Sequence, residues 1–415
     1  MQVLQPARAL VTVEYGGFLY GAEYETSNYG VSDFSSVSNQ PIACAVCEVA
    51  GAATLMIPAT TNCPAGWMTE YQGYLMANYY SHRKGEYVCV DKNPESASIG
   101  NSNTNQARWY PTETYCGSLP CPPYTQDREL SCVVCSPSLN VSGTVYTRWG
   151  RTSCPNDTEL VYSGRAASTH TSESGSGANN LCLYGNPTYL QHNDNQQQGA
   201  RIYGIQYYTN GYGLRSFYSL HQHRAPCSVC LKSTAETNLM IPGRNDCPTD
   251  WTVEYKGYLM ANYYNHHKIN WVCVDENPES LGYSPSGQGR WYPTETECGR
   301  MKCQNGIKGA YYQDWELSCA LCSPSTSRRS SVFTHWGSNS CPNGTRTVYS
   351  GFMGGSYYSY SGSGANLLCM QAQAVYGEHE TQSQSGALLY GYEYRTRGYG
   401  LRNSEFQNVH NRQRT

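Results

Sequence analysis

The sequence predicts an all-β protein made of two tandem disulfide-rich β domains, one of them split between the N- and C-terminal ends. Gly, Pro, Asn and Ser recur roughly every eight to twelve residues and long periodic helical segments are absent, a pattern typical of short strands joined by turns. The chain has 20 Cys, and its hydrophobic content of 39% is modest. Disulfides stabilise such thin apolar cores, so we expect β-sandwich or barrel-like domains held by bridges.

An internal repeat with a period of about 185 residues defines the domain organisation. The segment "CPAGWMTEYQGYLMANYY" from Cys63 matches "CPTDWTVEYKGYLMANYY" from Cys247. A second block, "VYTRWGRTSCPN" from Val145, matches "VFTHWGSNSCPN" from Val332. This period is too long for a solenoid, so each unit is expected to be a domain.

The cysteines fall into two equal sets on this period, and we predict that all of them belong to a disulfide framework. One set is continuous: Cys154, Cys182, Cys227, Cys230, Cys247, Cys273, Cys298, Cys303, Cys319 and Cys322. The other set lies at the two ends of the chain: Cys44, Cys47, Cys63, Cys89, Cys116, Cys121, Cys132, Cys135, Cys341 and Cys369. Spacing alone leaves the connectivity open.

This split predicts a strand-forming arm at 1–17, an incomplete unit at 18–143, a complete unit at 144–330 and a partial unit at 331–415. Neither end fragment is expected to bury a full apolar face alone, so the partial unit should complete the 18–143 unit. Completion in the same subunit gives a closed monomer. Completion in the next subunit gives a fibre, because a heterologous contact that does not close on itself keeps growing.

A Tyr-rich motif occurs three times, whereas the other repeated segments occur twice. The copies are "FLYGAEYETSNYG" from Phe18, "RIYGIQYYTNGYG" from Arg201 and "LLYGYEYRTRGYG" from Leu388. Alternating Tyr and polar residues bounded by Gly predict an exposed strand. Two copies would compete for one position in a closed monomer, so we predict pairing between chains. The assembly candidates are Tyr20, Tyr24, Tyr390, Tyr394, Arg395, Arg397 and Tyr399.

The four Cys-x-x-Cys pairs begin at Cys44, Cys132, Cys227 and Cys319. In a cytosolic protein such pairs indicate zinc sites. Here the intervening residues, such as Ala-Val and Val-Val, favour a strand, on which positions i and i+3 point to opposite faces. We therefore prefer structural disulfides to a zinc site or a redox pair.

Charge and cysteine usage predict a secreted, extracellular protein. The net charge is -3, so neither a nucleic acid nor a membrane surface is implied as a partner. No apolar run approaches the ~18 residues that would span a bilayer. The opening "MQVLQPARALVTVEYGG" lacks the apolar stretch of a secretory signal, so we expect a mature form. Glycosylation sequons at Asn140, Asn156 and Asn343 agree with the cysteine content.

Several repeated polar residues are candidates for metal binding or acid–base chemistry. His82 and His266 are equivalent and could bind a metal or titrate at mildly acid pH. The paired carboxylates are Glu70 with Glu254, Asp91 with Asp275, and Glu113 with Glu295. Their "NPES" and "PTET" contexts are typical of turns and caps. Since no catalytic or nucleotide-binding motif is present, we expect neither an enzyme nor a cofactor.

Tyrosine is unusually frequent, at 38 Tyr against 6 Phe. Phenol rings pack, hydrogen-bond and stack with Arg, so we expect cohesive Tyr and Arg contacts. Lys84 and Lys268, which are equivalent in the repeats, are candidates for an isopeptide crosslink with Asn or Asp.

The segments "LMIPATTNCPAGWMTEYQGYLMANYY", "VCVDKNPE", "CGSLPCPPY" and "CVVC" resemble the Cys-rich repeat of secreted sponge, cnidarian and mollusc proteins labelled short-chain collagen-like. This resemblance extends from about Tyr20 to Gly400, although no Gly-X-Y run is present and a triple helix is excluded. The split, Tyr-rich arrangement also resembles bivalve byssal thread proteins of the barbulin type. That resemblance implies a load-bearing extracellular fibre with covalently locked chain contacts.

These observations together predict a structural subunit of an extracellular fibre or matrix that polymerises head to tail. Its partner is another copy of itself, with other matrix proteins as further partners. The alternative is a secreted carbohydrate-binding, lectin-like or adhesion module, since Trp and Tyr around "CPAGW" offer platforms for sugar stacking.

Overall fold

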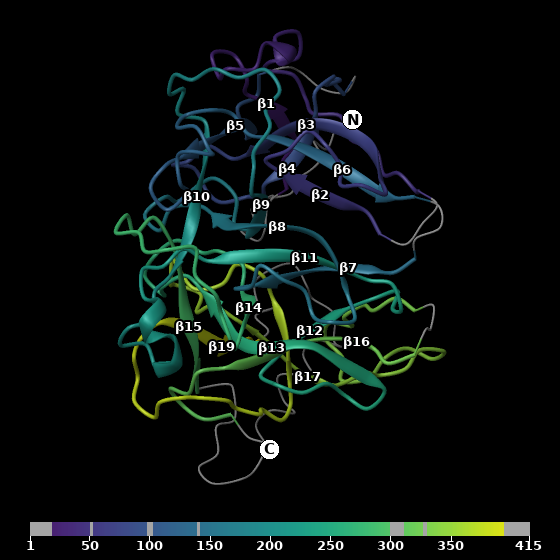
Figure 1. Ribbon diagram of the computed structural model, residues 1–415, viewed down its shortest axis with the longest axis vertical. Helices are drawn as coiled ribbons and strands as arrows, with labels where there is room; N and C mark the ends of the chain where they lie inside the picture. Colours follow the sequence, from purple (N-terminus) through teal and green to yellow (C-terminus); the bar gives the residue numbers. More distant parts are fainter. Residues whose placement is uncertain are drawn as a thin grey trace, which may run out of the picture. The chain divides into compact units, whose positions relative to one another are not determined.

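The computed structural model describes residues 19–49, 53–97, 103–138, 142–298, 311–326 and 330–393. The fold reported below is that of one compact unit, Gly21–Tyr392 (Figure 1). Nineteen strands and two short 3-10 helices make up its regular structure in the described residues, so the predicted all-β class is confirmed. The arm at 1–17 and the candidates Tyr394, Arg395, Arg397 and Tyr399 lie outside the described residues.

The strands follow the sequence repeat, and we call residues 21–203 repeat 1 and residues 204–390 repeat 2. The strands of repeat 1 are β1 (Ala22–Tyr24), β2 (Leu55–Pro58), β3 (Trp67–Ala77), β4 (Val88–Asp91), β5 (Ala107–Tyr115), β6 (Ser131–Pro137), β7 (Thr144–Trp149), β8 (Glu159–Ser168) and β9 (Leu181–Tyr184). The strand β10 (Ala200–Tyr207) crosses from one repeat to the next.

Repeat 2 continues in the same order. Its strands are β11 (Pro226–Lys232), β12 (Leu239–Pro242), β13 (Trp251–Ala261), β14 (Val272–Asp275), β15 (Gly289–Glu297), β16 (Ser318–Pro324), β17 (Gly351–Gly355), β18 (Leu368–Gln371) and β19 (Ala387–Gly391). The 3-10 helices are η1 (Ser32–Phe34) and η2 (Arg215–Leu220).

The "GYLMA" segments form the central strands β3 and β13, where the sequence left strand and helix open. Each pairs in antiparallel fashion with the short Val-Cys-Val-Asp strand, β4 or β14, and with the CxxC strand, β6 or β16. Gly73 and Gly257 allow the close approach, since a Cβ there would lie 1.8 Å from the carbonyl oxygen of Val90 or Val274. Glycine is therefore required where these strands meet.

The core of each repeat is completed by the last strands of that same repeat. Leu183 and Ile202 pack with Leu75 in repeat 1, and Met370 and Leu389 pack with the β13 core in repeat 2. This grouping differs from the predicted one, in which 331–415 completed the 18–143 unit. The reason is that a repeat closes through β8 to β10, or β17 to β19, and these strands lie after the predicted boundaries.

The three Tyr-rich motifs occupy different positions and do not compete. The first half of β10 pairs in parallel with β5, and its second half pairs in parallel with β15 (Figure 1). In repeat 1, β1 occupies the position on β5 that the second half of β10 occupies on β15. In repeat 2, β19 occupies the position on β15 that the first half of β10 occupies on β5. Each end of the chain therefore contains half of a strand that is continuous only in the middle.

Buried glutamates hold the loops that lead into β10 and β19. Glu113 accepts the Gln197 N–H at 2.7 Å, and its equivalent Glu295 accepts the Gln384 N–H at 3.0 Å. Burial raises the pKa of Glu113 to about 7 and the pKa of Glu295 to about 8. Their cross-strand neighbours Glu129 and Glu316 are also buried, and burial raises the pKa of each to about 7. These carboxyl groups are structural acceptors.

Raising the pH should destabilise the fold through these groups. In the unfolded chain a Glu loses its proton near its ordinary pKa of 4.5, whereas in the folded protein Glu113 and Glu295 retain the proton up to about pH 7 to 8. The free energy of unfolding therefore decreases as the pH rises from the ordinary pKa to the folded-state pKa. We expect the thermal unfolding midpoint to fall between about pH 5 and about pH 9, and Glu295→Gln to reduce that fall. The control is Glu159→Gln at an exposed site, and an unchanged slope in the Glu295 variant would contradict this assignment.

Candidate strand-binding site

The two repeats are joined by the insertion of one strand, β11 of repeat 2, between β7 and β8 of repeat 1 (Figure 1). Residues 226–232 pair with β7 over its whole length, from Cys227 opposite Trp149 to Lys232 opposite Thr144. On the other side the same residues pair with 159–165 of β8. Both backbone edges of β11 are therefore satisfied by the preceding repeat.

Two disulfides fix this strand. Cys227 is bonded to Cys182 of β9, and Cys230 is bonded to Cys154, with Cα–Cα distances of 5.8 Å in both cases. Between them Val229 is only 2% exposed and packs in a core cluster with Tyr162. The inserted strand thus contributes both apolar burial and covalent closure.

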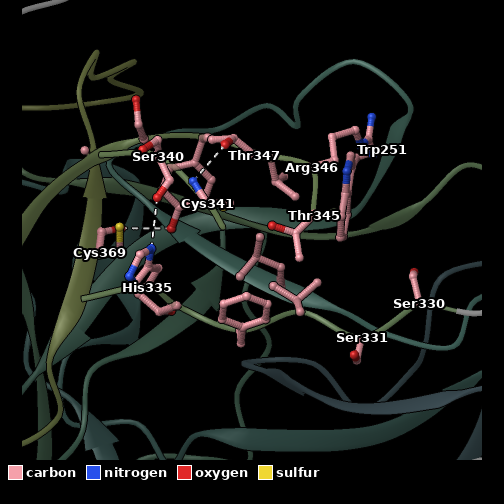
Figure 2. A pocket seen from close by; sticks show the side chains of 18 of the residues that line it. Trp251, Ser330, Ser331, His335, Ser340, Cys341, Thr345, Arg346, Thr347 and Cys369 are labelled. Atoms are coloured by element: carbon pink, nitrogen blue, oxygen red, sulfur yellow. Dashed lines mark hydrogen bonds between the residues drawn. The ribbon is translucent and has the colours of Figure 1, made fainter. Parts of the chain in front are cut away.

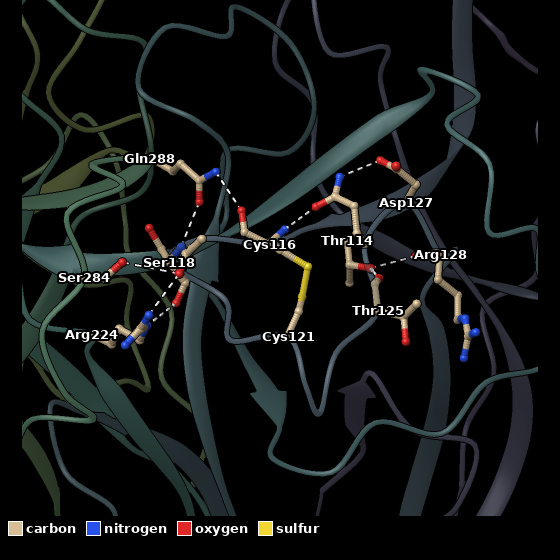
Figure 3. The surroundings of a disulfide bond; sticks show 12 residues. Thr114, Cys116, Ser118, Cys121, Thr125, Asp127, Arg128, Arg224, Ser284 and Gln288 are labelled. Atoms are coloured by element: carbon tan, nitrogen blue, oxygen red, sulfur yellow. Dashed lines mark hydrogen bonds between the residues drawn. A yellow bond between two sulfur atoms is a disulfide. The ribbon is translucent and has the colours of Figure 1, made fainter.

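Polar contacts extend the junction beyond β11. In Figure 3 the loop closed by Cys116–Cys121 meets Arg224 and Gln288 of repeat 2. Arg224 donates to the carbonyl of Ser118 at 3.0 Å, and the Gln288 amide donates to the carbonyl of Cys116 at 2.9 Å. These bonds hold the two repeats in a defined register.

The N-terminal counterpart of β11 has no such environment. Residues 43–49, which we call the donor segment, lie 183 positions before 226–232 and share the Cys-x-x-Cys pattern. They form no strand, although the structure describes all of them. Val46, equivalent to Val229, is fully exposed. Cys44 and Cys47 are exposed free thiols.

The C-terminal counterparts of β7 and β8 have no strand inserted between them. Residues 331–336 and 346–352, which we call the acceptor segments, lie 187 positions after 144–149 and 159–165. No strand forms anywhere in 331–350, a stretch that the structure describes completely. Phe333 is 57% exposed, whereas its equivalent Tyr146 is 5% exposed. Strand structure begins only at Gly351, where β17 pairs with β18.

The acceptor segments enclose a pocket of about 330 Å³ (Figure 2), which we call the acceptor pocket. Val332, Val348 and Tyr349 line it, together with Trp251 of β13. Cys341 and Cys369 both line this pocket (Figure 2), and both are free thiols. The pocket therefore combines an apolar lining with two reactive groups.

The apolar lining is an incomplete copy of the core around β11. In repeat 1 this core cluster contains Ile57, Val133, Cys135, Tyr162 and Cys182, together with Cys227 and Val229 of the inserted strand. The equivalent cluster in repeat 2 contains Ile241, Trp251, Ala320 and Cys322, with Val332, Val348 and Tyr349 packed against it. The contribution that the repeat 2 cluster lacks is that of an inserted strand.

The predicted disulfide framework is confirmed for most cysteines, whereas four cysteines are free thiols in the single chain. Seven bonds join Cys63–Cys135, Cys89–Cys132, Cys116–Cys121, Cys154–Cys230, Cys182–Cys227, Cys247–Cys322 and Cys273–Cys319. Cys298 is also disulfide-bonded, and Cys303 lies outside the described residues. The free thiols are Cys44, Cys47, Cys341 and Cys369. The bonded equivalents of these four cysteines are joined through the inserted strand β11, and neither the donor segment nor the acceptor pocket has that pairing in the single chain.

The paired CxxC motifs behave as predicted for strands. In β6, Cys132 bonds to Cys89 and Cys135 bonds to Cys63. The two members of the pair therefore take part in separate bridges on opposite faces of the strand, and neither a zinc site nor a redox pair forms there.

The repeated histidines belong to aromatic clusters. His82 lies beside Tyr79 and Tyr110, with ring centroids 5.0 and 6.0 Å away. His266 packs in the same way on Tyr263, and burial lowers the pKa of His266 to about 4. Both rings are packing residues in this structure.

The remaining carboxylates take structural partners. Glu254 is buried and forms an ion pair with Lys232 at 3.2 Å. Across the junction, Asp275 accepts a hydrogen bond from the Arg148 guanidinium at 2.7 Å. Their repeat 1 equivalents make local bonds: Glu70 accepts the Ser136 hydroxyl and Asp91 accepts the Asn93 N–H.

One trio of carboxylates approaches the geometry of a metal site. Oxygens of Glu295, Glu297 and Asp314 lie within 4.8 Å of one another. The Gln313 amide donates to Glu297 at 2.7 Å and to Asp314 at 2.5 Å. An amide donor already bridges two of these carboxylates.

Neither crosslink candidate contacts an Asn or Asp side chain through its amine among the bonds of the described residues. Lys84 donates to the carbonyl of Gly175 at 3.4 Å, and burial lowers its pKa to about 7. Burial also lowers the pKa of Lys268. The predicted isopeptide remains a prediction.

The described assembly candidates have mixed environments. The prediction that Tyr24 makes surface contacts is wrong, because Tyr24 is only 2% exposed and its hydroxyl donates to the carbonyl of Glu95 at 3.0 Å. The rings of Tyr390 and Tyr357 pack at a tilt of 51° with centroids 5.1 Å apart, and Tyr20 is half exposed. Sequence reasoning did not single out the donor segment. The signal in the sequence was that Cys44 and Cys47 are the repeat equivalents of Cys227 and Cys230, whose disulfide partners lie in the preceding repeat.

The glycosylation candidates Asn156 and Asn343 lie in exposed turns, and Asn140 lies outside the described residues. Asn156 stays exposed although β11 is inserted beside it. A glycan at either position is therefore compatible with strand insertion.

Comparison with models of known protein families found no match. Among the residues that the structure describes, none of the helices is long and apolar enough to cross a membrane. The seven disulfides are compatible with an oxidising, extracellular compartment.

Proposed function

We propose that the chain is a secreted structural subunit of an extracellular fibre or matrix, and that it polymerises head to tail by strand insertion. The donor segment of one copy enters the acceptor pocket of the preceding copy and pairs with both acceptor segments. The observation that carries this proposal is the incomplete core around Trp251 and Tyr349, which lacks the contribution that Cys227 and Val229 make in the complete core. The resemblance of the repeats to secreted matrix proteins agrees with this role.

The junction within the chain supplies the register for the junction between chains. Applying the repeat offsets to the β11 pairings places Cys44 opposite Trp336, and Val46 opposite Tyr349. Val46 then takes the buried position of Val229, which stabilises the contact by about 1.5–3 kcal/mol. The donor segment and the acceptor segments then pair as strands, so that the backbone groups of the donor segment gain partners on both sides.

One charge pair is specific to the contact between copies. Leu231 lies opposite Glu159 within the chain, and the equivalent positions between copies are Glu48 and Arg346. Oppositely charged residues directly across an antiparallel pair stabilise it by about 0.2–1 kcal/mol. The donor segment is thus better matched to the acceptor segments than β11 would be.

The ends of the chain also fit a repeating contact. In a polymer, β19 of one copy and β1 of the next copy lie at the positions of the two halves of β10. Each added copy restores the same surfaces, so the contact is heterologous and the polymer grows. Other matrix proteins can join only at its surface or ends.

Replacing Val46 by Asp should prevent polymerisation, because the substitution removes apolar burial and places a charge in the acceptor pocket. The loss of about 1.5–3 kcal/mol corresponds to an association constant at least about tenfold weaker. Sedimentation velocity and negative-stain imaging of the purified full chain give the readout.

The matched control is Val253→Asp. Val253 is exposed on β13, and its repeat 1 equivalent Thr69 is exposed although β11 is inserted there. This control should polymerise like the natural chain. Monodisperse monomers of the natural chain at all concentrations, or filaments of the Val46 variant with unchanged affinity, would overturn the proposal.

Reversing the charge pair tests the register. Glu48→Arg and Arg346→Glu should each weaken association a few-fold, because like charges then face each other across the strands. The double variant should recover most of the lost affinity, as measured by sedimentation at low ionic strength. Additive losses in the double variant would show that these residues are not opposite one another.

A further inference from the structure

We propose that every contact between copies is closed by two interchain disulfides, Cys44 to Cys369 and Cys47 to Cys341. This inference rests on the proposed strand insertion. It adds the covalent chemistry of the junction, and identifies the partner of each of the four free thiols.

The repeat assigns the pairs without ambiguity. Cys44 and Cys47 lie 183 positions before Cys227 and Cys230. Those residues bond to Cys182 and Cys154, and the cysteines 187 positions after these are Cys369 and Cys341. All four are free in the single chain, and they divide evenly between the donor segment and the acceptor pocket.

The surroundings of Cys369 already match those of the bonded Cys182. The Tyr162 hydroxyl donates to the carbonyl of Cys182 at 2.8 Å, and the Tyr349 hydroxyl donates to the carbonyl of Cys369 at 2.9 Å. Gly351 repeats Gly164, at which a Cβ would lie 3.3 Å from the Cys182 sulfur and 1.9 Å from the Leu183 carbonyl oxygen. The acceptor side therefore retains the space that a disulfide needs.

The two bonds also require the correct register. Residues three apart on a strand face opposite sides, so Cys44 and Cys47 reach different partners. A slip of one residue would turn both cysteines to the wrong faces and neither bond would form. Formation of both bonds is thus a specific marker of the inserted strand.

The oxidant is a small disulfide of the glutathione type. The exposed thiolate of Cys44 attacks the small disulfide, forms a mixed disulfide and releases one small thiol. The Cys369 thiolate then attacks the Cys44 sulfur and releases the second small thiol. Two protein thiols are oxidised, the small disulfide is reduced to two thiols, and these carry the two protons. Cys47 and Cys341 react in the same way.

The test uses two double variants that each lose two cysteines. Cys44→Ser with Cys369→Ser removes both ends of one predicted bond and leaves Cys47 to Cys341 intact. Cys44→Ser with Cys341→Ser removes one end of each bond and leaves no matched pair. Full chains are assembled with oxidised glutathione, their free thiols are blocked, and they are analysed on denaturing gels without reductant.

We expect a ladder of covalent oligomers for the natural chain and for the matched variant, and single chains for the mismatched variant. Disulfide mapping of a mixture of ¹⁵N-labelled and unlabelled natural chains should give hybrid Cys44–Cys369 and Cys47–Cys341 peptides. Hybrid peptides show that the bonds join different copies. Equal behaviour of the two variants, other pairings, or the predicted pairs without hybrid peptides would overturn the inference.

Sedimentation of the same samples before denaturation separates this inference from the proposed function. Polymers that sediment in the native state but dissociate to single chains with four blockable thiols would refute the interchain disulfides and leave strand insertion standing. Absence of polymers in the native state would refute the proposed function itself.

Discussion

The structure depends on one constraint: both edges of the inserted strand β11 are paired by the preceding repeat. Backbone N–H and C=O groups in a buried strand need partners, and here the partners are β7 and β8. A repeat therefore supplies a strand to its predecessor and accepts one from its successor. A chain of two repeats satisfies this requirement once, in the middle, and leaves a donor segment at one end and an acceptor pocket at the other.

Local patterns were sufficient to predict much of the fold. The Val-Cys-Val-Asp strands, the all-β class and the separate bridging of Cys132 and Cys135 follow from period-two alternation and turn residues. The "GYLMA" strands remained undecided between strand and helix, because a short apolar run fits both. Their strand pairing depends on close contact at Gly73 and Gly257, which is a tertiary property.

The strand-binding site could not be predicted in this way, because an inserted CxxC segment and a free one have the same local sequence pattern. Val229 and Val46 both lie inside a CxxC motif that follows a Pro, yet one is buried and the other is fully exposed. The difference comes from partners far away in the sequence. The Tyr-rich motif shows the same limit: its alternation predicts a strand, but not that the two halves of β10 pair with different repeats.

Amide hydrogen exchange of the donor segment tests the central claim most directly. Residues 43–49, 331–336 and 346–350 form no strand in the single chain, so their amides should exchange rapidly, as in other exposed loops. On assembly, both sets should become protected together, at least about a hundredfold, as expected for strands in a sheet. Polymers in which residues 43–49 still exchange as fast as in the monomer would contradict the account.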